Sequence, residues 1–325
     1  MMYDAIKNFP AQFSFEPVVE NAEKLHSVDG FIIAGMGGSH LAADLLRIWK
    51  PEIDLTVYSD YGFPAHIKAE WQTHQLFIAS SYSGNTEETI DGFVEAGRRG
   101  IARAAIAVGG KLRDLARAEG VSFVQFPDTG IQPRSSIGFG IKALLALMGE
   151  TEALASVGGL AQRLASRMDE CEKTGKTLAE QMRGFVPVIY ASDRNRAISY
   201  NWKIKFNETG KIPAFYNVFP ELNHNEMTGF DCIDTTRILS ERMFFVFLED
   251  ESDHPKVQKR MAITKELYAA RKIKVASIAM TGGNVFEKIF SCTLIADWAA
   301  LYTAKLYGVE ADQVPMVEEF KKRIA

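Results

Sequence analysis

The sequence has few cysteines, no excess of basic charge and no long apolar run, and each of these features excludes a class of protein. Cysteine occurs three times in 325 residues, at Cys171, Cys232 and Cys292. An odd number with no close pair is typical of reduced thiols and argues against a disulfide framework or a zinc site. Lysine and arginine number 37 against 41 aspartates and glutamates, which gives a net charge of −4. A mildly acidic chain lacks the basic charge that general nucleic-acid binding requires.

The apolar residues also form no membrane segment. No apolar run approaches the roughly 20 residues that cross a bilayer. The N-terminal stretch MMYDAIKNFPAQFSFEP lacks the basic and then apolar regions of a secretion signal. Hydrophobic residues make up 47% of the chain and charged residues 24%, as is usual in globular proteins. We therefore expect a cytoplasmic globular protein with neither nucleic-acid nor membrane partners.

Short apolar runs alternate with amphipathic stretches along the first half of the chain. Near-continuous apolar strands are typical of a parallel sheet that is covered on both faces. Alternation of strand and helix then predicts βαβ units and a doubly wound sheet. The strands are expected at 31–34, 55–58, 76–80, 104–108 and 122–126, and the helices at 40–49, 87–99 and 111–119.

The second half repeats this alternation after an alanine- and leucine-rich helical region from Ser135 to about Arg183. We predict an α/β protein with two doubly wound domains, residues 1–152 and 153–325, each a mainly parallel sheet flanked by helices. The motifs of the two halves differ, so any duplication is structural. Strands are expected at 188–191, 243–249 and 273–279, and helices at 194–207, 255–271, 284–307 and 315–323.

A glycine-rich turn, residues 35–40 (GMGGSH), lies directly after the first predicted strand. Glycine lets the backbone approach a ligand closely and adopt positive φ angles, and the N-terminus of the following helix offers free N–H groups to an anion. Ser39 is a good helix N-cap, so a turn that only caps a helix would explain the same residues. The turn lacks the Gly-Lys-Ser/Thr ending of a Walker A loop and the third glycine of a dinucleotide fingerprint.

A second turn, residues 80–89 (SSYSGNTEET), follows the strand predicted at 76–80 and also opens a helix. Ser81, Ser83 and Thr86 place three hydroxyls around it. Hydroxyls and free N–H groups together form a cradle for a phosphate without basic side chains. Capping a helix needs only one hydroxyl, so three of them favour an anion site. We interpret Glu87-Glu88 as a first helical turn favoured by the helix dipole.

These two turns resemble the sugar isomerase (SIS) domain, whose S-x-S-G-x-T turn binds the phosphate of a sugar phosphate. The second half is similar to the bifunctional phosphoglucose/phosphomannose isomerases at Asn207-Glu208, at 213–215 (PAF) and at 219–226 (FPELNHNE). Residues 133–139 (PRSSIGF) fit the same group. The resemblance spans the chain from about residue 30 to the C-terminus. It implies an aldose–ketose isomerase that interconverts glucose 6-phosphate, and mannose 6-phosphate as a second aldose, with fructose 6-phosphate, and needs no metal or organic cofactor.

The resemblance also implies roles for individual residues. Glu208 would be the base that moves a proton between C1 and C2, and His224 would help to open the sugar ring. Arg134 would stabilise the negative charge of the enediolate. The family's C-terminal lysine falls at Lys321, with Lys322 as a neighbouring candidate. The phosphate ligands would be Gly37, Gly38, Ser39, Ser81, Ser83 and Thr86.

Two further features follow from the resemblance. It implies a homodimer in which His224 reaches the active site of the other subunit. It also implies a threonine seven residues before the C-terminal lysine, linked to acceptance of both C2 epimers, where this chain has Val314. That departure weakens the expectation for mannose 6-phosphate.

Other interpretations stay open on the residues alone. A single glutamate is most often a solvated surface charge, and His224 or Arg134 could serve a purely structural hydrogen bond or ion pair. A non-catalytic sugar-phosphate-binding SIS regulator is an alternative function, as is an SIS enzyme for another phosphosugar. A dinucleotide dehydrogenase is disfavoured by the missing glycine and by the hydroxyl-rich second turn.

Overall fold

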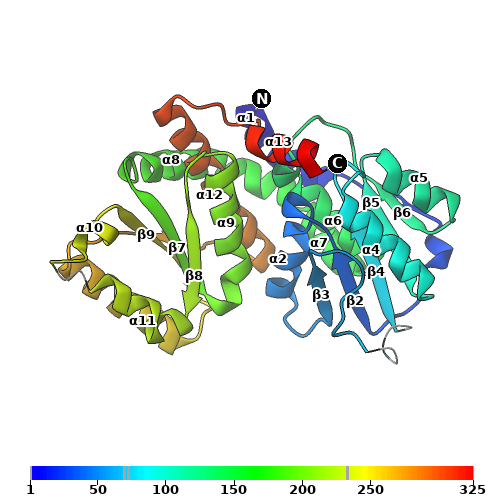
Figure 1. The fold of residues 1–325 in the computed structure, drawn as a ribbon, viewed down its shortest axis with the longest axis horizontal. Coiled ribbons are helices and arrows are strands. Elements are labelled where there is room, and N and C mark those ends of the chain that lie inside the picture. The colour runs from blue at the N-terminus through cyan, green and yellow to red at the C-terminus, as the bar shows by residue number, and fades with distance from the viewer. Residues whose placement is uncertain (1, 69–70, 72–73, 232–233, 325) are drawn as a thin grey trace. The chain divides into compact units, whose positions relative to one another are not determined.

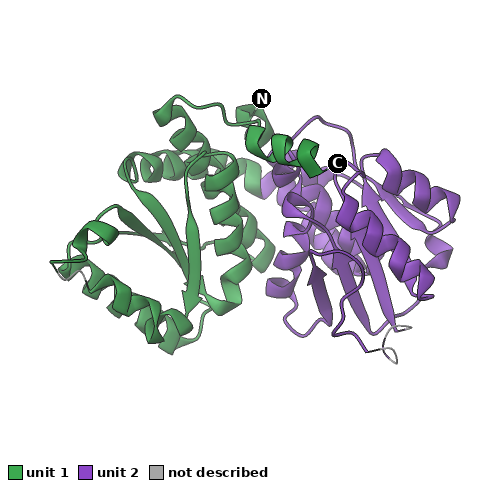
Figure 2. Cartoon of the chain, in the orientation of Figure 1, with its two compact units in different colours: residues 1–6, 164–325 green, residues 7–163 purple. Residues whose placement is uncertain are grey.

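The computed structural model describes residues 2–68, 71, 74–231 and 234–324. The chain forms two compact units (Figure 2), the N-terminal unit of residues 7–163 and the C-terminal unit of residues 1–6 and 164–325. The division falls in the first turn of α8 (Leu160–Gln181), after the short helix α7 (Thr151–Gly158). Because α7 packs on α6 (Ile137–Leu147), the N-terminal unit extends beyond Glu152, where the sequence places the domain boundary.

The N-terminal unit contains a six-stranded sheet in the order β1-β6-β5-β4-β2-β3, in which β1 alone is antiparallel to its neighbour. Five of these strands lie where the apolar runs predict them. The short strand β1 was not predicted, because two residues carry no periodicity. The bounds are β1 Val19–Glu20, β2 Gly30–Ala34, β3 Leu55–Tyr58, β4 Gln75–Ser80, β5 Ala102–Ala107 and β6 Ser122–Gln125.

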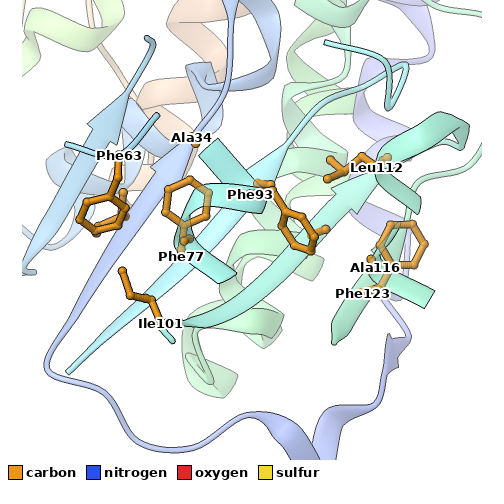
Figure 3. Close-up of a cluster of buried hydrophobic side chains, with 13 residues drawn as sticks. Ala34, Phe63, Phe77, Phe93, Ile101, Leu112, Ala116 and Phe123 are labelled. Carbon is orange, nitrogen blue, oxygen red and sulfur yellow. The ribbon is translucent and has the colours of Figure 1, made fainter. Parts of the chain in front are cut away.

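Helices cover both faces of this sheet. On one face α4 (Glu87–Arg98) and α5 (Gly110–Ala118) bury a cluster that includes Phe77, Phe93 and Phe123 (Figure 3). Full burial of each such side chain contributes about 1.5–3 kcal/mol. Alternate strand residues point to the opposite face, where α2 (Leu41–Trp49) packs against α6. The apolar strands therefore meet helices on both sides, as the sequence predicts.

The C-terminal unit contains a four-stranded, all-parallel sheet in the order β10-β9-β7-β8. Numbered along its own unit, this order is fourth, third, first, second, and β5-β4-β2-β3 of the N-terminal unit repeats it. The two halves thus share a topology although their motifs differ. The bounds are β7 Val186–Ser192, β8 Phe215–Phe219, β9 Met243–Glu249 and β10 Lys274–Ala279, with helices α9 Arg196–Glu208, α10 Arg237–Ser240, α11 Pro255–Ala270, α12 Val285–Tyr307 and α13 Pro315–Ile324 (Figure 1).

The short helix α1 (Met2–Lys7) begins the chain but its first residues belong to the C-terminal unit. The ring of Tyr3 lies edge-on to the ring of Trp298 in α12, with 5.1 Å between centroids. The backbone N–H of Met2 donates to Asp312 Oδ2 at 3.2 Å. Met2 and Tyr3 therefore pack on α12 and on the segment that follows it.

The described cysteines are free, buried thiols. Burial raises the pKa of Cys171 to about 11 and that of Cys292 to about 12, so both stay protonated at neutral pH, as expected for unreactive core thiols. Cys232 lies outside the described residues. Within the described part of the chain, no helix combines the length and the apolar character needed to span a bilayer.

Candidate active site

The glycine-rich turn after β2 folds into the short 3₁₀ turn η3 (Gly37–Ser39) that leads into α2. The sequence predicts Ser39 as the N-cap of this helix, and this is wrong, because His40 occupies the cap position and makes no side-chain capping bond. Ser39 instead joins the two predicted turns. Its hydroxyl oxygen accepts from the N–H of Tyr82 at 3.1 Å, and its carbonyl oxygen accepts from Ser80 Oγ at 2.8 Å.

Gly37 and Gly38 are required for different reasons. Gly37 has a φ of +53° and open space around the position of a Cβ atom. A Cβ on Gly38 would lie 2.5 Å from the backbone nitrogen of Arg134 and 2.6 Å from the carbonyl carbon of Pro133. At Gly38 the glycine is therefore needed for the close approach of the backbone of Pro133 and Arg134, and not for that of a ligand. This contact packs the glycine turn against the segment that carries Arg134.

The serine-rich turn connects β4 to α4 and gathers two of its hydroxyls. Ser81 Oγ lies 2.8 Å from Thr86 Oγ1 and also accepts from the N–H of Gly84 at 3.1 Å. Ser81 is fully buried and Thr86 is half-buried. Ser83 is exposed, and its hydroxyl oxygen accepts from the N–H of Asn85 at 3.2 Å. Thr86 is the N-cap of α4 but makes no side-chain capping bond, so its hydroxyl faces Ser81 and not the helix.

A neighbouring turn holds the serine-rich turn in place. Gly84 has a φ of +73°, and a Cβ there would lie 1.7 Å from the carbonyl oxygen of Gly109. The carbonyl of Gly84 accepts from the N–H of Leu112 at 2.8 Å, and Asn85 Oδ1 accepts from the N–H of Lys111 at 3.0 Å. The N–H groups of Lys111 and Leu112 in the first turn of α5 are therefore already bonded to the serine-rich turn. The start of α4 keeps the N–H groups that have no intrahelical partner, and Glu87 and Glu88 lie in its first turn as predicted.

Arg134 lies in η4 (Pro133–Ser135), directly before α6, and is 1% exposed. Gln12, a residue the sequence gives no reason to single out, supports this segment. Its side-chain amide donates to the carbonyl of Ser135 at 2.7 Å and accepts from the N–H of Gly138 at 3.0 Å. Arg134 thus supplies a buried, permanently charged guanidinium from the segment whose backbone touches the glycine turn, and such a charge suits the stabilisation of a developing anion.

Glu208 is the last residue of α9 in the C-terminal unit and is half-buried. Its carbonyl oxygen accepts from Lys211 Nζ. One turn earlier on the same helix, the buried ammonium of Lys205 pairs with Asp297 of α12 at 2.7 Å. Since α9 is tied to α12 by this ion pair, the end of α9 that carries Glu208 is held in a fixed place within its unit.

The other two predicted catalytic residues lie on separate elements of the same unit. His224 is exposed at the end of η6 (Glu221–His224). Lys321 is exposed on α13, where its ammonium pairs with Glu318 at 2.9 Å, and Lys322 is exposed beside it. Val314 is half-buried just before α13. The structure thus gathers the glycine turn, the serine-rich turn and Arg134 in the N-terminal unit, and places Glu208, His224 and Lys321 in the C-terminal unit.

The strand ends of the C-terminal unit carry carboxylates where the N-terminal unit carries hydroxyls. After β9, Asp253 Oδ1 accepts from Ser192 Oγ at 2.7 Å, while Asp250 Oδ1 accepts from the N–H of Ser252 at 2.9 Å and from Lys288 Nζ at 3.0 Å. A phosphate would be repelled by these carboxylates. Across the described ranges, no three histidine, cysteine, aspartate or glutamate side chains gather as metal ligands would.

Comparison with known proteins places the chain in a family. Residues 171–324 match the model of the "Bacterial phospho-glucose isomerase C-terminal SIS domain". A "Bifunctional phosphoglucose/phosphomannose isomerase" from Caldicellulosiruptor bescii is 31% identical over 100% of this chain and 99% of its own length, and one from Thermoplasma volcanium is 34% identical over 93% of each. The chain belongs to the bifunctional phosphoglucose/phosphomannose isomerase family.

A solved structure from outside this isomerase family has the same fold. The C-terminal domain of glucosamine-fructose-6-phosphate aminotransferase from Francisella tularensis superimposes with a TM-score of 0.70, at 13% identity and 96% coverage of both chains. This likeness extends over both units, so the predicted fold class of two SIS-type α/β domains is confirmed.

Proposed function

We propose that this protein is an aldose–ketose isomerase that interconverts glucose 6-phosphate and fructose 6-phosphate, with mannose 6-phosphate as a second aldose. The family to which the chain belongs supports the reaction class. The observation that carries the proposal is the Ser81–Thr86 turn, whose gathered hydroxyls lie at the start of α4. This turn is bonded through Tyr82 to Ser39 of the glycine turn, which in turn touches the segment of Arg134 at Gly38. The pathway we propose is carbohydrate metabolism in the cytoplasm, at the step shared by glycolysis and gluconeogenesis.

The phosphate of the sugar is bound by hydroxyl and N–H groups in this proposal. Ser39, Ser81, Ser83 and Thr86 supply the hydroxyls, and the first turn of α4 supplies N–H groups with the positive end of the helix dipole. Gly37 and Gly38 form the adjoining turn. A phosphate held in this way anchors the sugar, so that binding energy from a group remote from the reaction orients the carbons that react.

Glu208 is the base of the proposed reaction. It removes the proton from C2 of the open-chain aldose, and the electron pair passes to the carbonyl oxygen O1 to form the enediolate. It then returns the proton to C1, while the proton of the O2 hydroxyl passes to O1 and C2 becomes the carbonyl carbon of the ketose. Arg134 stabilises that oxygen with its permanent charge. His224 moves the proton between ring oxygen and O1 hydroxyl when the ring opens, and Lys321 is a further cation near the substrate. No step calls for a metal or an organic cofactor.

The exchange of Glu208 for glutamine tests this mechanism directly. We expect Glu208→Gln to lower kcat on both aldoses by about a hundredfold or more, the typical contribution of a positioned base, with KM little changed. Glu266→Gln, at an exposed position on α11, is the matched control and should keep the kcat of the wild type. Full activity of Glu208→Gln would remove Glu208 from the reaction.

The position of the substrate can be tested with an enediolate analogue. In a crystal soaked with 5-phosphoarabinonate, we expect the phosphate at the Ser81–Thr86 turn and the carboxylate towards Arg134 and Glu208. A phosphate bound elsewhere would refute the anchoring role of the turn.

We further propose a homodimer in which His224 completes the active site of the partner. The exposure of His224 on η6 is consistent with that role. Glu208→Gln and His224→Ala subunits would each keep only a small residual activity as homodimers, but a mixed dimer would contain one site with both native residues. After subunit exchange we expect about a quarter of the wild-type activity, because half of the dimers are mixed and half of their sites are intact. No recovery, in a mixture shown to exchange subunits, would mean that each subunit uses its own histidine.

A further inference from the structure

The segment that carries His224 is tied to the sheet of the C-terminal unit through Glu226. The hydroxyl of Tyr190, in β7, donates to Glu226 Oε1 at 2.5 Å. The side-chain amide of Asn217, in β8, donates to Glu226 Oε2. Both carboxylate oxygens of Glu226 are therefore bonded to strand residues, two positions after His224 in the chain.

Tyr190 donates this bond from an apolar environment, because aromatic side chains surround its ring. It is fully buried, and its ring contacts the rings of Phe219, Phe245 and Phe247. Burial, with the nearby Tyr268 and Glu226, raises the pKa of Tyr190 far above its usual range, so the phenol remains a hydrogen-bond donor. The hydroxyl of Tyr268 lies 3.3 Å from that of Tyr190, but the bond to Glu226 is shorter and its acceptor is charged. A buried hydroxyl without a good acceptor is costly, and this cost favours the position in which Glu226 reaches the sheet.

A second tie holds the other side of the same segment. The side chain of Asn223 makes two bonds to α11. Its Nδ2 donates to Thr264 Oγ1 at 2.9 Å, and its Oδ1 accepts from Arg260 Nη1 at 3.4 Å. His224 lies between Asn223 and Glu226 and is itself exposed. The backbone on both sides of the imidazole is thus fixed, while the imidazole is left accessible.

We infer that Glu226, held by Tyr190 and Asn217, is a positioning residue for His224 in the opening of the sugar ring. We call these three residues the Glu226 clamp. The inference rests on the proposed function. It gives a role to Glu226, a residue of the 219–226 motif that has no role in the proposed mechanism. The clamp does not contact the substrate in this scheme. It acts by limiting the positions that the His224 backbone can adopt, because proton transfer requires the imidazole within hydrogen-bond reach of the sugar oxygens.

A double-mutant cycle separates this role from general support of the fold. If Glu226 acts through His224, its loss should matter only while the imidazole is present. We expect Glu226→Ala to lower kcat on glucose 6-phosphate by about tenfold to a hundredfold, within the range of general acid–base contributions, with KM unchanged. In a His224→Ala background the same change should lower kcat less than about twofold. Equal losses in both backgrounds, or no loss in either, would overturn the clamp.

Two further variants control the cycle. Glu172→Ala removes a carboxylate that accepts from the hydroxyl of Tyr302 at 2.7 Å, between α8 and α12 of the same unit. It breaks a bond of the same chemistry elsewhere and should leave kcat unchanged. Glu226→Gln retains an acceptor for Tyr190 and should recover part of the lost kcat. If Glu226→Ala does not fold, Asn217→Ala, which removes one of the two donors, takes its place in the cycle.

A measurement on the imidazole distinguishes failure of the clamp from failure of the proposed function. The chain has six histidines, and the ring signals of His224 can be assigned in NMR spectra by their loss in His224→Ala. We expect relaxation of these signals to show a more mobile ring in Glu226→Ala than in the wild type. A wild type that isomerises no hexose phosphate would reject the proposed function, whereas unchanged mobility of the ring would reject the clamp in an active or an inactive protein.

Discussion

Ser81 and Thr86 share a hydrogen bond of 2.8 Å between their hydroxyl oxygens. Ser81 is fully buried at the end of β4, and Thr86 is the N-cap of α4. The pair therefore spans the turn, and the N–H of Gly84 points to the same serine oxygen at 3.1 Å. A turn fixed in this way requires little ordering when it binds an anion, which reduces the entropic cost of binding.

Removal of the Ser81 hydroxyl should weaken binding of phosphorylated substrates. Ser81→Ala deletes one candidate ligand and leaves Thr86 without its partner in the turn. Because a hydrogen bond to a charged group contributes about 1.5–3 kcal/mol, we expect KM for fructose 6-phosphate to rise at least about tenfold, and inhibition by inorganic phosphate to weaken in parallel. Steady-state kinetics and phosphate inhibition would measure both.

The control for this experiment is another buried serine in the same unit. Ser122 donates to the carbonyl of Asn21 at 3.0 Å and is fully buried at the start of β6. Ser122→Ala should change stability but not KM. A similar KM for the two variants would show that the turn does not bind the phosphate.

A methyl group at Gly38 should displace the segment of Arg134. The added Cβ would lie 2.5 Å from the backbone nitrogen of Arg134, and overpacking of this kind costs about 1–3 kcal/mol. We expect Gly38→Ala to lower both the free energy of unfolding, measured in urea, and kcat. Gly158→Ala, at the end of α7, is the control, because a Cβ there would lie 3.9 Å from Lys142 Nζ of α6, an ordinary contact distance. Gly38→Ala with normal stability and normal kcat would contradict the tight contact.

Asp250 and Asp253 should give opposite contributions to the pH dependence of stability. Burial raises the pKa of Asp253, although Ser192 donates a hydrogen bond to it. Burial also acts to raise the pKa of Asp250, but the N–H of Ser252 and the ammonium of Lys288 outweigh it and lower that pKa. A raised pKa means that ionised Asp253 destabilises the fold as pH rises, whereas a lowered pKa means that the stabilisation from Asp250 is lost as pH falls.

Asparagine at each position tests these signs. We expect Asp253→Asn to be more stable than the wild type at neutral pH, and to lose this advantage in acid, where the wild-type carboxyl becomes protonated. Asp250→Asn should be less stable at neutral pH, with a penalty that shrinks in acid. Urea unfolding at neutral and at acidic pH measures both. The same sign for the two variants would refute the assignment.

Val314 should limit the use of mannose 6-phosphate. Threonine is close to valine in shape and adds a hydroxyl at the position where the family resemblance places one. A hydrogen bond contributes about 0.5–1.5 kcal/mol, so we expect Val314→Thr to raise the kcat/KM ratio of mannose 6-phosphate to glucose 6-phosphate by about two- to tenfold. Val309→Thr, at an exposed position, serves as the control. An unchanged ratio in Val314→Thr would mean that this position does not select the epimer.

Much of the fold follows from local patterns in the sequence. The strands β3 and β9 lie at the predicted residues 55–58 and 243–249, because each is a short apolar run with clear ends. The strand β8 was missed. It lies between Pro213 and Pro220 and contains Asn217, so its apolar run is broken, and Phe215 is 55% exposed on this edge strand. Edge strands carry a weaker hydrophobic signal because one side of the strand is unpaired and less covered.

The candidate site could be predicted by residue type but not by contact. The hydroxyls of residues 81–86 were recognised from their spacing, and the structure shows how two of them meet. That Ser39 bonds to Tyr82, or that Gly38 touches the backbone of Arg134, depends on which strands and turns become neighbours in space. Such contacts are set by the topology of the sheet and leave no periodic signal in the sequence.

The packing of α1 has a consequence for synthesis of the chain on the ribosome. Residues 7–163 contain every strand of the first sheet and can fold as soon as they emerge, since domains fold in order of translation. Met2 and Tyr3 must wait for Asp312 and Trp298, so these two residues form their native contacts late although they precede the N-terminal unit in the sequence. A protein fused before Met2 would therefore disturb the contacts of Met2 and Tyr3 with the C-terminal unit, and it would leave the folding of the N-terminal unit unchanged.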